Sequence, residues 1–296
     1  MRILVVGGSG FLGRKIVDIF NKCFRGHLEV YSTYYNQSRF KYHPNYYYLD
    51  ALSKDNVRKL LSKINPDVVI HLVGIPNPDV CEMNKELAYN VNVGSTKTIV
   101  EECLKRKIKI VYTSTNYVFD GINSPYKEND KPNPLNWYGK TKLMGEDIVR
   151  SLLQNNHIIV RLPLLYGYCG YDTNNFLLKV IKSLKANNTL IVNNRSIRYP
   201  TLIDDVAIII GRLIEKRCVG TYHVSSLEGI TKYKFALRIA KTFNLPCDLL
   251  REENVFSLAK RPLEAKLNIT KILGILKVKM HNIDQGLKMV KEQMVL

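Results

Sequence analysis

The chain has 296 residues, of which 46% are hydrophobic and 24% are charged. This composition excludes a mainly disordered chain, because the apolar content can offset the entropy lost on folding. Lysine and arginine exceed aspartate and glutamate by 44 to 26, which gives a formal net charge of +18. Such a charge favours anionic partners, but no recognition motif for nucleic acid accompanies it, so we expect no nucleic-acid partner.

The cysteines, the histidines and the apolar runs bound the class of protein further. No two of the 6 cysteines are spaced C-x-x-C, and the 6 histidines show no close ligand spacing, so we expect no metal site. The apolar run at the start is too short for a signal peptide. No run reaches the roughly 18 residues needed to cross a membrane. We therefore expect a cytoplasmic protein with no membrane partner.

The first half of the chain alternates short apolar runs with helical segments. Strands are predicted at residues 3–6, 28–33, 46–49, 68–72, 108–113 and 158–162. Helices are predicted at residues 11–23, 56–64, 85–105 and 136–153. This alternation predicts βαβ units with right-handed crossovers. The fold class is therefore α/β, with a Rossmann-like doubly wound parallel sheet.

The second half loses this strict alternation. Helices are predicted at residues 175–185, 204–215, 232–243 and 283–292, and short strands at 190–192 and 221–224. We therefore divide the chain into a dinucleotide-binding Rossmann domain, residues 1–163, and a smaller C-terminal substrate lobe, residues 164–296. We expect some strands or helices of the second range to return to the first.

The first predicted strand runs into a glycine-rich turn, in which Gly7, Gly10 and Gly13 form a G-x-x-G-x-x-G pattern. Glycine permits a tight turn and a close approach of the backbone to a pyrophosphate. The helix that follows begins at Phe11 and Leu12, and its N-terminus offers N–H groups and a positive dipole end. At a strand–turn–helix junction, this pattern predicts a dinucleotide site.

The end of the second strand indicates which cofactor binds. An acidic residue there would favour NAD, but residues 31–39 (YSTYYNQSR) contain no carboxylate. Arg39, helped by Ser38 or Lys41, can neutralise a 2′-phosphate, so we predict NADP (NADPH) with NAD as the alternative. Asp50 follows the third strand and can bond the adenine amino group. Ser53 is the better placed of the two to cap the next helix.

Three side chains with catalytic chemistry follow the fifth strand. Thr115 lies at its carboxyl end, where an α/β sheet binds ligands. Tyr138 and Lys142 are spaced i, i+4, so a helix places both on one face. A nearby ammonium lowers the pKa of a phenol, which is otherwise near 10. We therefore expect Lys142 to activate Tyr138 and to hold the cofactor ribose, while Thr115 polarises a substrate carbonyl.

The sequence resembles the extended short-chain dehydrogenase/reductase superfamily and, within it, the dTDP-4-dehydrorhamnose reductase family. The resemblance rests mainly on residues 114–121 (STNYVFDG), 126–138 (YKENDKPNPLNWY) and 139–146 (GKTKLMGE). Weaker support comes from residues 66–71 (PDVVIH), 198–201 (RYPT) and 261–262 (RP). The likeness covers essentially the whole chain and is specific mainly in residues 112–146.

The resemblance implies hydride transfer from NAD(P)H to the C4 ketone of a nucleotide-linked 4-keto-6-deoxy sugar, as in dTDP-rhamnose synthesis. Tyr138 would donate the proton, Lys142 would tune it, and Thr115 would bond the carbonyl oxygen. Residues at strand ends complete the expected cofactor site, namely Leu72, Val73, Gly74, Thr113 and Leu162.

The expected substrate contacts are Asn77, Asn116, Tyr117, Asn175 and Arg198. Arg198 can meet a diphosphate bidentately; the alternative is a surface arginine. The alternative for Asn77 and Asn175 is loop capping. We also expect Asn92, inside the long helix at 85–105, to brace the catalytic strand.

The chain departs from the resemblance at three positions. Asn116 stands where the family usually has aspartate, so an ionisable group becomes neutral. Leu164 lies where the sugar reductases commonly have tryptophan, which removes a flat platform for a sugar ring. Lys15 stands where some members have a glutamate in a metal-bridged dimer contact, so that metal is not expected. A homodimer is a further expectation from the family.

A second resemblance points to a different class of function. Residues 161–167 (RLPLLYG), 198–201 and 231–233 (TKY) look more like the regulatory β subunit of methionine adenosyltransferase. That branch implies an NADP-binding subunit that partners methionine adenosyltransferase, with little or no reductase activity. Epimerase and dehydratase activities are further alternatives. A dehydratase needs an acid–base carboxylate pair after Thr115, and Asn116 and Tyr117 supply none.

Overall fold

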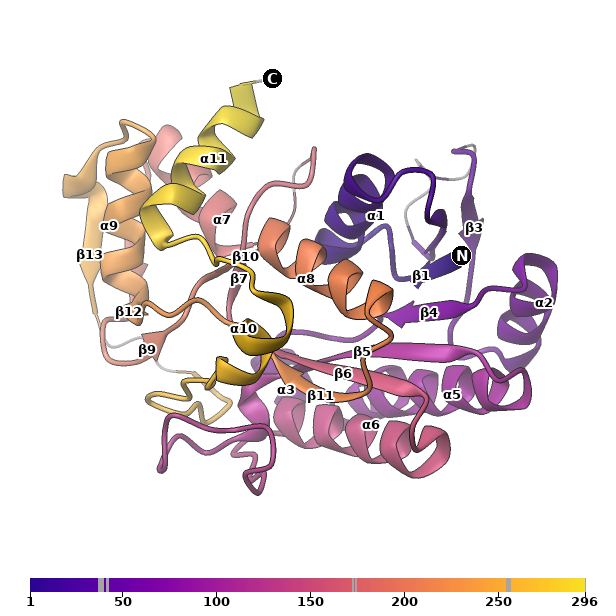
Figure 1. Cartoon of the computed structure of the whole chain (residues 1–296). Coiled ribbons are helices and arrows are strands. Elements are labelled where there is room, and N and C mark those ends of the chain that lie inside the picture. The colour runs from indigo at the N-terminus through magenta and orange to yellow at the C-terminus, as the bar shows by residue number, and fades with distance from the viewer. Residues whose placement is uncertain (37–39, 41–42, 172, 174, 254–256, 296) are drawn as a thin grey trace.

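A seven-stranded parallel sheet lies at the centre of the protein (Figure 1). The computed structural model describes residues 1–36, 40, 43–171, 173, 175–253 and 257–295. The strand order is β11-β6-β5-β4-β1-β2-β3, and it reverses between β1 and β4. These strands are β1 (Arg2–Val6), β2 (Glu29–Tyr34), β3 (Tyr46–Tyr48), β4 (Val68–His71), β5 (Lys109–Thr115), β6 (His157–Leu162) and β11 (Gly220–His223). This topology confirms the predicted Rossmann-like fold, whose ligand site lies where the order reverses.

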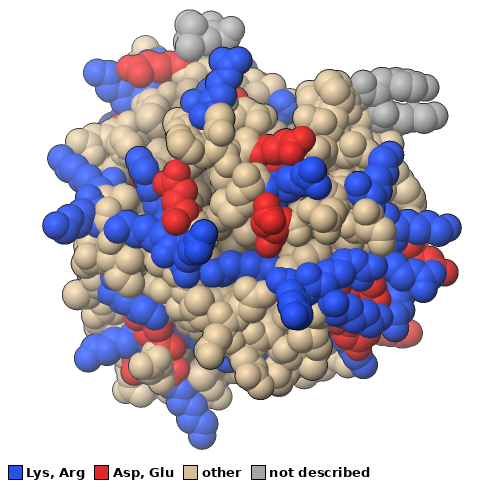
Figure 2. All heavy atoms as spheres, turned by 45° about the vertical axis from the view of Figure 1, so that its right-hand side comes forward, with Lys and Arg blue, Asp and Glu red and all other residues tan. Residues whose placement is uncertain are grey.

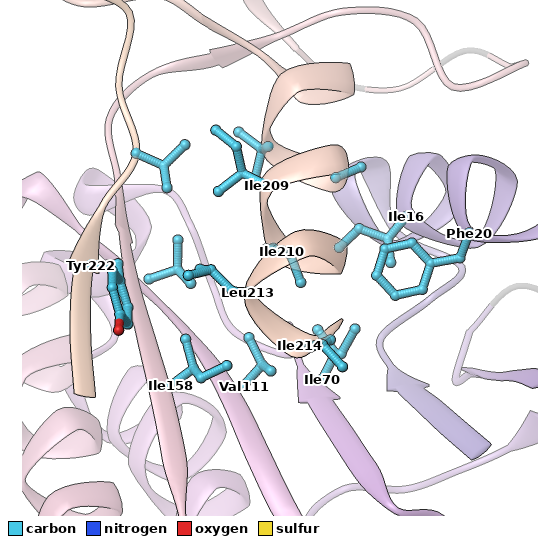
Figure 3. Close-up of a cluster of buried hydrophobic side chains, with 14 of the residues drawn as sticks. Ile16, Phe20, Ile70, Val111, Ile158, Ile209, Ile210, Leu213, Ile214 and Tyr222 are labelled. Carbon is cyan, nitrogen blue, oxygen red and sulfur yellow. The ribbon is translucent and has the colours of Figure 1, made fainter. Parts of the chain in front are cut away.

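Helices cover both faces of the sheet. One face packs against α1 (Phe11–Cys23), α8 (Ile203–Glu215) and α10 (Thr270–Leu276). The other packs against α2 (Lys54–Ile64), α5 (Ser95–Lys105) and α6 (Trp137–Leu153). In Figure 3, Leu213 and Ile210 of α8 lie between the side chains of α1 and those of the strands. The strands are apolar at nearly every position because both of their faces are buried.

A smaller lobe lies at the left of the sheet in Figure 1. Its core joins three helices to two short paired strands. These elements are α7 (Phe176–Lys185), α9 (Lys232–Thr242), α11 (Ile283–Val295), β8 (Leu190–Val192) and β13 (Leu250–Glu252). Two pairings of two-residue strands complete it: β7 (Leu165–Tyr166) with β10 (Thr201–Leu202), and β9 (Ile197–Arg198) with β12 (Ile230–Thr231).

Three elements of residues 164–296, namely β11, α8 and α10, lie on the large sheet rather than in this lobe. β11 pairs with β6 as the outermost strand, from Gly220 opposite Ile158 to His223 opposite Arg161. Helix α8 packs beside α1 on one face of the sheet. The chain therefore crosses between the two parts more than once, and the division at residue 163 stays a prediction.

The segment after β4 differs from the single helix predicted at residues 85–105. It contains α3 (Pro78–Met83), α4 (Lys85–Tyr89), a π-helical turn (Asn90–Gly94) and then α5. Asn84 ends α3 and caps α4, since its Oδ1 accepts a hydrogen bond from Leu87 N at 2.9 Å. Helix α3 is too short to show an apolar period, and the π turn interrupts the longer helix, so neither was predictable from periodicity.

The ends of the helices account for part of the positive charge. Each of α1, α2, α5, α6, α7, α8 and α9 has a lysine or arginine in its last turn. A cation there interacts favourably with the negative end of the helix dipole. Figure 2 shows blue Lys and Arg side chains spread over one face of the protein, with fewer acidic side chains between them. Among the described residues, no helix is long and apolar enough to cross a membrane.

Candidate active site

The glycine loop joins β1 to α1 at the carboxyl edge of the sheet. Gly7 has φ +86°, a backbone conformation that residues with a side chain rarely adopt. A Cβ at Gly13 would lie 2.5 Å from Gly7 O, and one at Gly8 would lie 1.7 Å from Ser32 Oγ. Gly7 N donates a hydrogen bond of 2.9 Å to Thr33 Oγ1, which ties the loop to β2. The loop is therefore held close against both the helix and the neighbouring strand.

This loop ends at an uncapped helix N-terminus. Gly10 is the N-cap of α1, no side chain caps the helix, and its first turn contains no acidic residue. The N–H groups of Phe11 and Leu12 belong to the first turn, where a helix has no internal acceptor for them. An uncapped N-terminus beside a close-packed glycine turn fits the pyrophosphate of a dinucleotide.

The other expected cofactor residues lie along the same edge of the sheet. Val73 follows β4 next to the glycine loop, with its N 3.3 Å from a Cβ built on Gly7. Thr113 Oγ1 donates to His71 O at 3.2 Å. Leu162 is paired with Thr115 in the register of β5 and β6. Leu72 and Gly74 flank Val73 and are partly buried.

For two predicted cofactor contacts, Arg39 and Asp50, the described residues show no contact that supports cofactor binding. Arg39, like Ser38 and Lys41, lies outside the described residues. Asp50 Oδ1 accepts a hydrogen bond from Leu52 N at 3.0 Å, inside the turn before α2. Ser53 caps α2, accepting from Asn56 N at 3.3 Å, as predicted. Adenine binding by Asp50 stays a prediction.

The predicted catalytic side chains meet where β5 faces the start of α6. Thr115 is the last residue of β5 and is buried. Helix α6 starts after Asn136, whose Oδ1 accepts a hydrogen bond from Gly139 N at 2.8 Å. A Cβ at Gly139 would lie 2.2 Å from Tyr117 O, so glycine allows α6 to approach this turn. Thr115 Oγ1 accepts a hydrogen bond from Tyr117 N at 3.2 Å, and the Tyr117 ring lies 6.2 Å from the Tyr138 ring. The Thr115 and Tyr138 hydroxyl groups therefore lie in one site at the end of a central strand, close enough for Thr115 to act on the pKa of Tyr138.

The pKa of Tyr138 is shifted in the direction opposite to our expectation. Burial raises the pKa of Tyr138 to about 12, and the nearby Thr115 side chain only partly offsets this. Burial also lowers the pKa of Lys142 to about 7, against the attraction of the Glu146 carboxylate. Burial disfavours the charged form of each group. Tyr138 is therefore protonated at neutral pH, whereas Lys142 is protonated in only part of the molecules.

A buried ion pair that the sequence analysis missed fixes α6 to the sheet. Arg161 Nε and Nη2 donate to Glu146 Oε1 and Oε2 at 2.9 and 2.8 Å, and both side chains are at most 1% exposed. Burial is the largest single influence and raises the pKa of Glu146, but Arg161 and Arg150 together have the greater effect, so the pKa is lowered. Glu146 lies four residues after Lys142 on the same helix face, and this spacing is the sequence feature from which a role for Glu146 in the site could have been predicted.

Asn92 braces a different part of the site from the strand that we expected. Its Oδ1 accepts a hydrogen bond from Ile75 N at 2.7 Å, and its Nδ2 donates to Thr141 Oγ1 at 3.0 Å. Ile75 belongs to the loop after β4, and Thr141 lies between Tyr138 and Lys142 on α6. Asn92 therefore joins the loop of the cofactor edge to the catalytic helix.

Of the predicted substrate residues, Tyr117 lies next to Tyr138, and Arg198 lies next to Tyr117. The rings of Tyr117 and Tyr138 have centroids 6.2 Å apart, and the Arg198 guanidinium lies 5.7 Å from the Tyr117 centroid. Asn116 Nδ2 donates to Ala265 O at 3.0 Å. Arg198 is 6% exposed and donates to Pro262 O at 3.1 Å, so the alternative of a surface arginine is wrong.

Arg198 is one of several cations close to Lys232. Burial lowers the pKa of Lys232 to about 8, and the charges of Arg198, Arg261 and Lys179 add to this effect. Asp79 is the carboxylate that acts in the other direction on Lys232. Its two oxygens already bind Arg261, at 3.1 and 2.6 Å. Positive charge therefore exceeds negative charge in this part of the site, which suits an anionic ligand.

Asn77 and Asn175 both cap helices. Asn77 Oδ1 accepts from Asp79 N at 3.0 Å at the start of α3, and Asn175 Oδ1 accepts from Leu178 N at 3.1 Å at the start of α7. These are the capping roles given as the alternative. Substrate contacts by the two side chains stay predictions.

Comparison with known proteins assigns the chain to a family. The model of the RmlD substrate binding domain matches residues 1–295. The chain belongs to this family. The methionine adenosyltransferase 2 subunit beta of Rattus norvegicus is 33% identical over 286 residues, covering 93% of this chain and 83% of the relative. The dTDP-4-dehydrorhamnose reductase of Aggregatibacter actinomycetemcomitans is 30% identical over 286 residues, covering 92% of each chain.

Solved structures of the reductase share the fold of this RmlD family member. A dTDP-4-dehydrorhamnose reductase from Clostridium acetobutylicum matches with a TM-score of 0.86 at 28% identity, covering 100% of both chains. The dTDP-4-dehydrorhamnose reductase from Bacillus anthracis, solved in complex with NADP, matches with a TM-score of 0.87 at 26% identity, covering 99% of each. The recognition of this family from the sequence is confirmed.

Within the RmlD family, Lys15 is one of the three departures noted in the sequence. Its Nζ lies 3.0 Å from Asp204 Oδ1 and 3.1 Å from Gln293 Oε1, and the lysine is 5% exposed. An ammonium therefore joins α1, α8 and α11 at this point. No group of three or more potential metal ligands occurs among the described residues.

Proposed function

We propose that this protein binds NADP(H), with NAD as the alternative, and reduces the C4 ketone of a nucleotide-linked 4-keto-6-deoxy sugar. The observation that supports this best is the proximity of the Thr115 and Tyr138 side chains at the end of β5, where Thr115 acts to lower the pKa of Tyr138. Two hydroxyl groups therefore lie at the sheet edge that also bears the glycine loop. The NADP in the Bacillus anthracis reductase supports the same cofactor here.

Each catalytic side chain has a separate task in this reaction. NADPH supplies the hydride when it is bound. Thr115 donates a hydrogen bond to the carbonyl oxygen, and Tyr138 transfers its hydroxyl proton to that oxygen as negative charge develops on it. The raised pKa of Tyr138 keeps the proton on the phenol until the alkoxide, a much stronger base, forms. Lys142 binds the ribose hydroxyls and stabilises the tyrosinate that remains, which solvent then reprotonates.

The cations beside Tyr117 support an anionic, diphosphate-linked substrate. Arg198 and Lys232 are held where positive charge exceeds negative charge. A diphosphate placed there would leave the attached sugar near Tyr117, whose ring lies beside Tyr138. The strong positive charge of the chain further favours the approach of anionic ligands.

Turnover of NADPH tests this proposal. Oxidation of NADPH is followed at 340 nm, the usual absorbance band, with dTDP-4-dehydrorhamnose as substrate and Tyr138→Phe as the matched control. We expect turnover by the wild type and a loss of at least about 100-fold in Tyr138→Phe, the usual scale of general acid catalysis. Absence of turnover with every 4-keto sugar nucleotide would refute the reductase proposal.

The second candidate is an NADP-binding regulatory subunit of methionine adenosyltransferase. Its support is the 33% identity to the beta subunit over 93% of this chain. Co-purification with a methionine adenosyltransferase, without sugar reduction, would favour this candidate. Size measurement of the purified protein would also test the expected homodimer. Under either candidate we propose a cytoplasmic protein.

A further inference from the structure

Arg14 lies at an electrostatically unfavourable position in helix α1. The helix starts at Phe11, so Arg14 is its fourth residue, and the first turn contains no acidic residue. The N-terminal end of a helix is the positive end of its dipole, and a cation there is repelled. A residue that breaks such a rule without local compensation often marks a functional site.

The contacts of Arg14 hold the side chain without neutralising it. Its guanidinium lies 4.4 Å from the centroid of the Tyr171 ring and 5.3 Å from that of Phe40. Among the described residues, it forms no ion pair with a carboxylate. The adjacent Lys15 is different, since its ammonium is paired with Asp204 at 3.0 Å. Arg14 is therefore a positioned, half-buried cation that has no carboxylate partner among the described residues.

Stacking leaves the edge of a guanidinium available for binding. A planar guanidinium that packs its faces on aromatic rings still presents its N–H groups around its edge, in a geometry that suits phosphate oxygens. Tyr171 and Phe40 thus orient Arg14 and leave these donors for an acceptor. An anion of the phosphate type is the chemistry that complements this arrangement.

Both rings belong to segments beside the expected ribose position. Phe40 lies between β2 and β3 and stacks on Tyr46 at 4.8 Å between centroids. The Tyr171 hydroxyl donates a hydrogen bond to Ser9 O in the glycine loop. In a dinucleotide-binding fold, the 2′ position of the adenosine ribose lies near the end of β2, and the pyrophosphate lies on the N-terminus of the first helix. Arg14 is therefore between the loop that follows β2 and the glycine loop.

We infer that Arg14 binds the 2′-phosphate of NADP(H) and makes this protein prefer NADP over NAD. The inference rests on the proposed function, because it assumes that the glycine loop binds a dinucleotide. The N–H groups of Phe11 and Leu12 bind the pyrophosphate common to both cofactors, whereas Arg14 meets the group that distinguishes them. Tyr171 and Phe40 act as positioning residues that keep the guanidinium in place.

Binding of the two cofactors to the purified full-length protein tests this role. The dissociation constants of NADPH and NADH are measured by titration calorimetry for wild type, Arg14→Met and Arg14→Lys. We expect Arg14→Met to weaken NADPH by at least about tenfold, the value of one charge-assisted hydrogen bond, and NADH by less than about threefold. Arg14→Lys should lie between wild type and Arg14→Met for NADPH. The fragment 2′,5′-ADP should show the same loss as NADPH, and 5′-AMP should not.

Arg25→Met is the matched control, because Arg25 is an exposed arginine just beyond the other end of α1. It should leave both affinities unchanged. Without ligand, Arg14→Met should melt at the same temperature as wild type or up to about 3 °C higher, since a repelled cation has been removed. A merely structural role predicts a lower melting temperature instead.

The outcomes against the inference are distinct from failure of the proposed function. Equal weakening of NADPH and NADH in Arg14→Met, or unchanged NADPH binding, would overturn the role of Arg14. A wild-type protein that binds neither cofactor would overturn the cofactor proposal and this inference together. A wild type that prefers NADPH but reduces no sugar would remove only the reductase activity.

Discussion

The ammonium of Lys142 lies 4.1 Å from the centroid of the Tyr112 ring, and the two side chains are 5% and 0% exposed. The π face of the ring attracts the ammonium, but it replaces only a small part of the lost hydration. Tyr112 O–H points to Lys142 O at 3.4 Å, so the same ring also contacts the backbone of α6. Burial in this position therefore lowers the pKa of Lys142 to about 7, so its charged form is partly lost at neutral pH.

Activity should consequently depend on pH near neutrality. The charged form of Lys142 binds ribose and stabilises tyrosinate, and this form is lost as the pH rises through about 7. We expect kcat/KM for NADPH-dependent reduction to be constant below that pH and to fall about tenfold per pH unit above it. Tyr138, with a pKa of about 12, stays protonated over this range. In Lys142→Arg the group stays charged, so a fall at the same pH in that variant would contradict this assignment.

Lys142 should also make the free energy of unfolding depend on pH, in the direction opposite to that of a lysine held in an ion pair. The unfolded lysine has a pKa near 10.4 and the folded one near 7, so between these values the unfolded state binds a proton that the folded state has lost. The free energy of unfolding should therefore rise with pH across this window. In urea titrations, Lys142→Met should be more stable than wild type at pH 6 and should lose this rise.

The Arg161–Glu146 pair leads to a third prediction. Arg161→Met would leave a carboxylate that is 0% exposed without its main partner, which typically costs about 3–5 kcal/mol. The double variant Arg161→Met/Glu146→Gln removes the charge as well and should regain most of this loss. Urea unfolding of the two single variants and the double variant measures the coupling. Additive losses would show that the two residues act independently.

The parts of the fold that could be predicted are those with a strong local signal. The apolar strands and the helix at Phe11–Cys23 were predictable because strands buried on both faces and long amphipathic helices have clear periods. Helix α3 was not, since six residues starting at a proline show no period. The position of β11 was also not predictable, because pairing with β6 joins residues about sixty positions apart and leaves no local trace.

The same distinction between local and non-local features applies to the candidate site. The Gly7–Gly13 spacing and the Tyr138–Lys142 spacing are local, and the structure brings these residues to one edge of the sheet. Burial is not local, so the raised pKa of Tyr138 and the buried position of Arg198 were missed. The stacking of Arg14 on Tyr171 joins residues far apart in the chain and was missed for the same reason.

A fourth prediction concerns the ion pair between Asp79 and Arg261, which fastens the segment before α10 to α3. The Arg261 guanidinium lowers the pKa of Asp79. The side chains are 34% and 20% exposed, so solvent screens the pair. We expect Arg261→Met to lower the free energy of unfolding by about 1 kcal/mol at pH 7. A depressed pKa gives stability that is lost as the pH falls through the folded value, so the difference should vanish at acid pH.

Asp79→Asn is the partner variant for this measurement. A double-mutant cycle should give a coupling energy of about 0.5–1 kcal/mol that decreases with added salt. Coupling that does not decrease as the pH is lowered below the ordinary range of an aspartate pKa would contradict an electrostatic origin.

The last prediction compares Gly13 and Gly274, two glycines with different surroundings. A Cβ at Gly13 would lie 2.5 Å from Gly7 O and from Gly8 Cα, so Gly13→Ala must push the glycine loop away from α1. At Gly274, inside α10, a Cβ would meet nothing within 4 Å. Gly13→Ala should lower stability by about 1–3 kcal/mol and weaken NADPH and NADH alike. Gly274→Ala should raise stability by up to about 1 kcal/mol, because alanine favours a helix, and leave both affinities unchanged. Urea unfolding and cofactor titration measure both effects, and tight cofactor binding by Gly13→Ala would contradict the role of the loop.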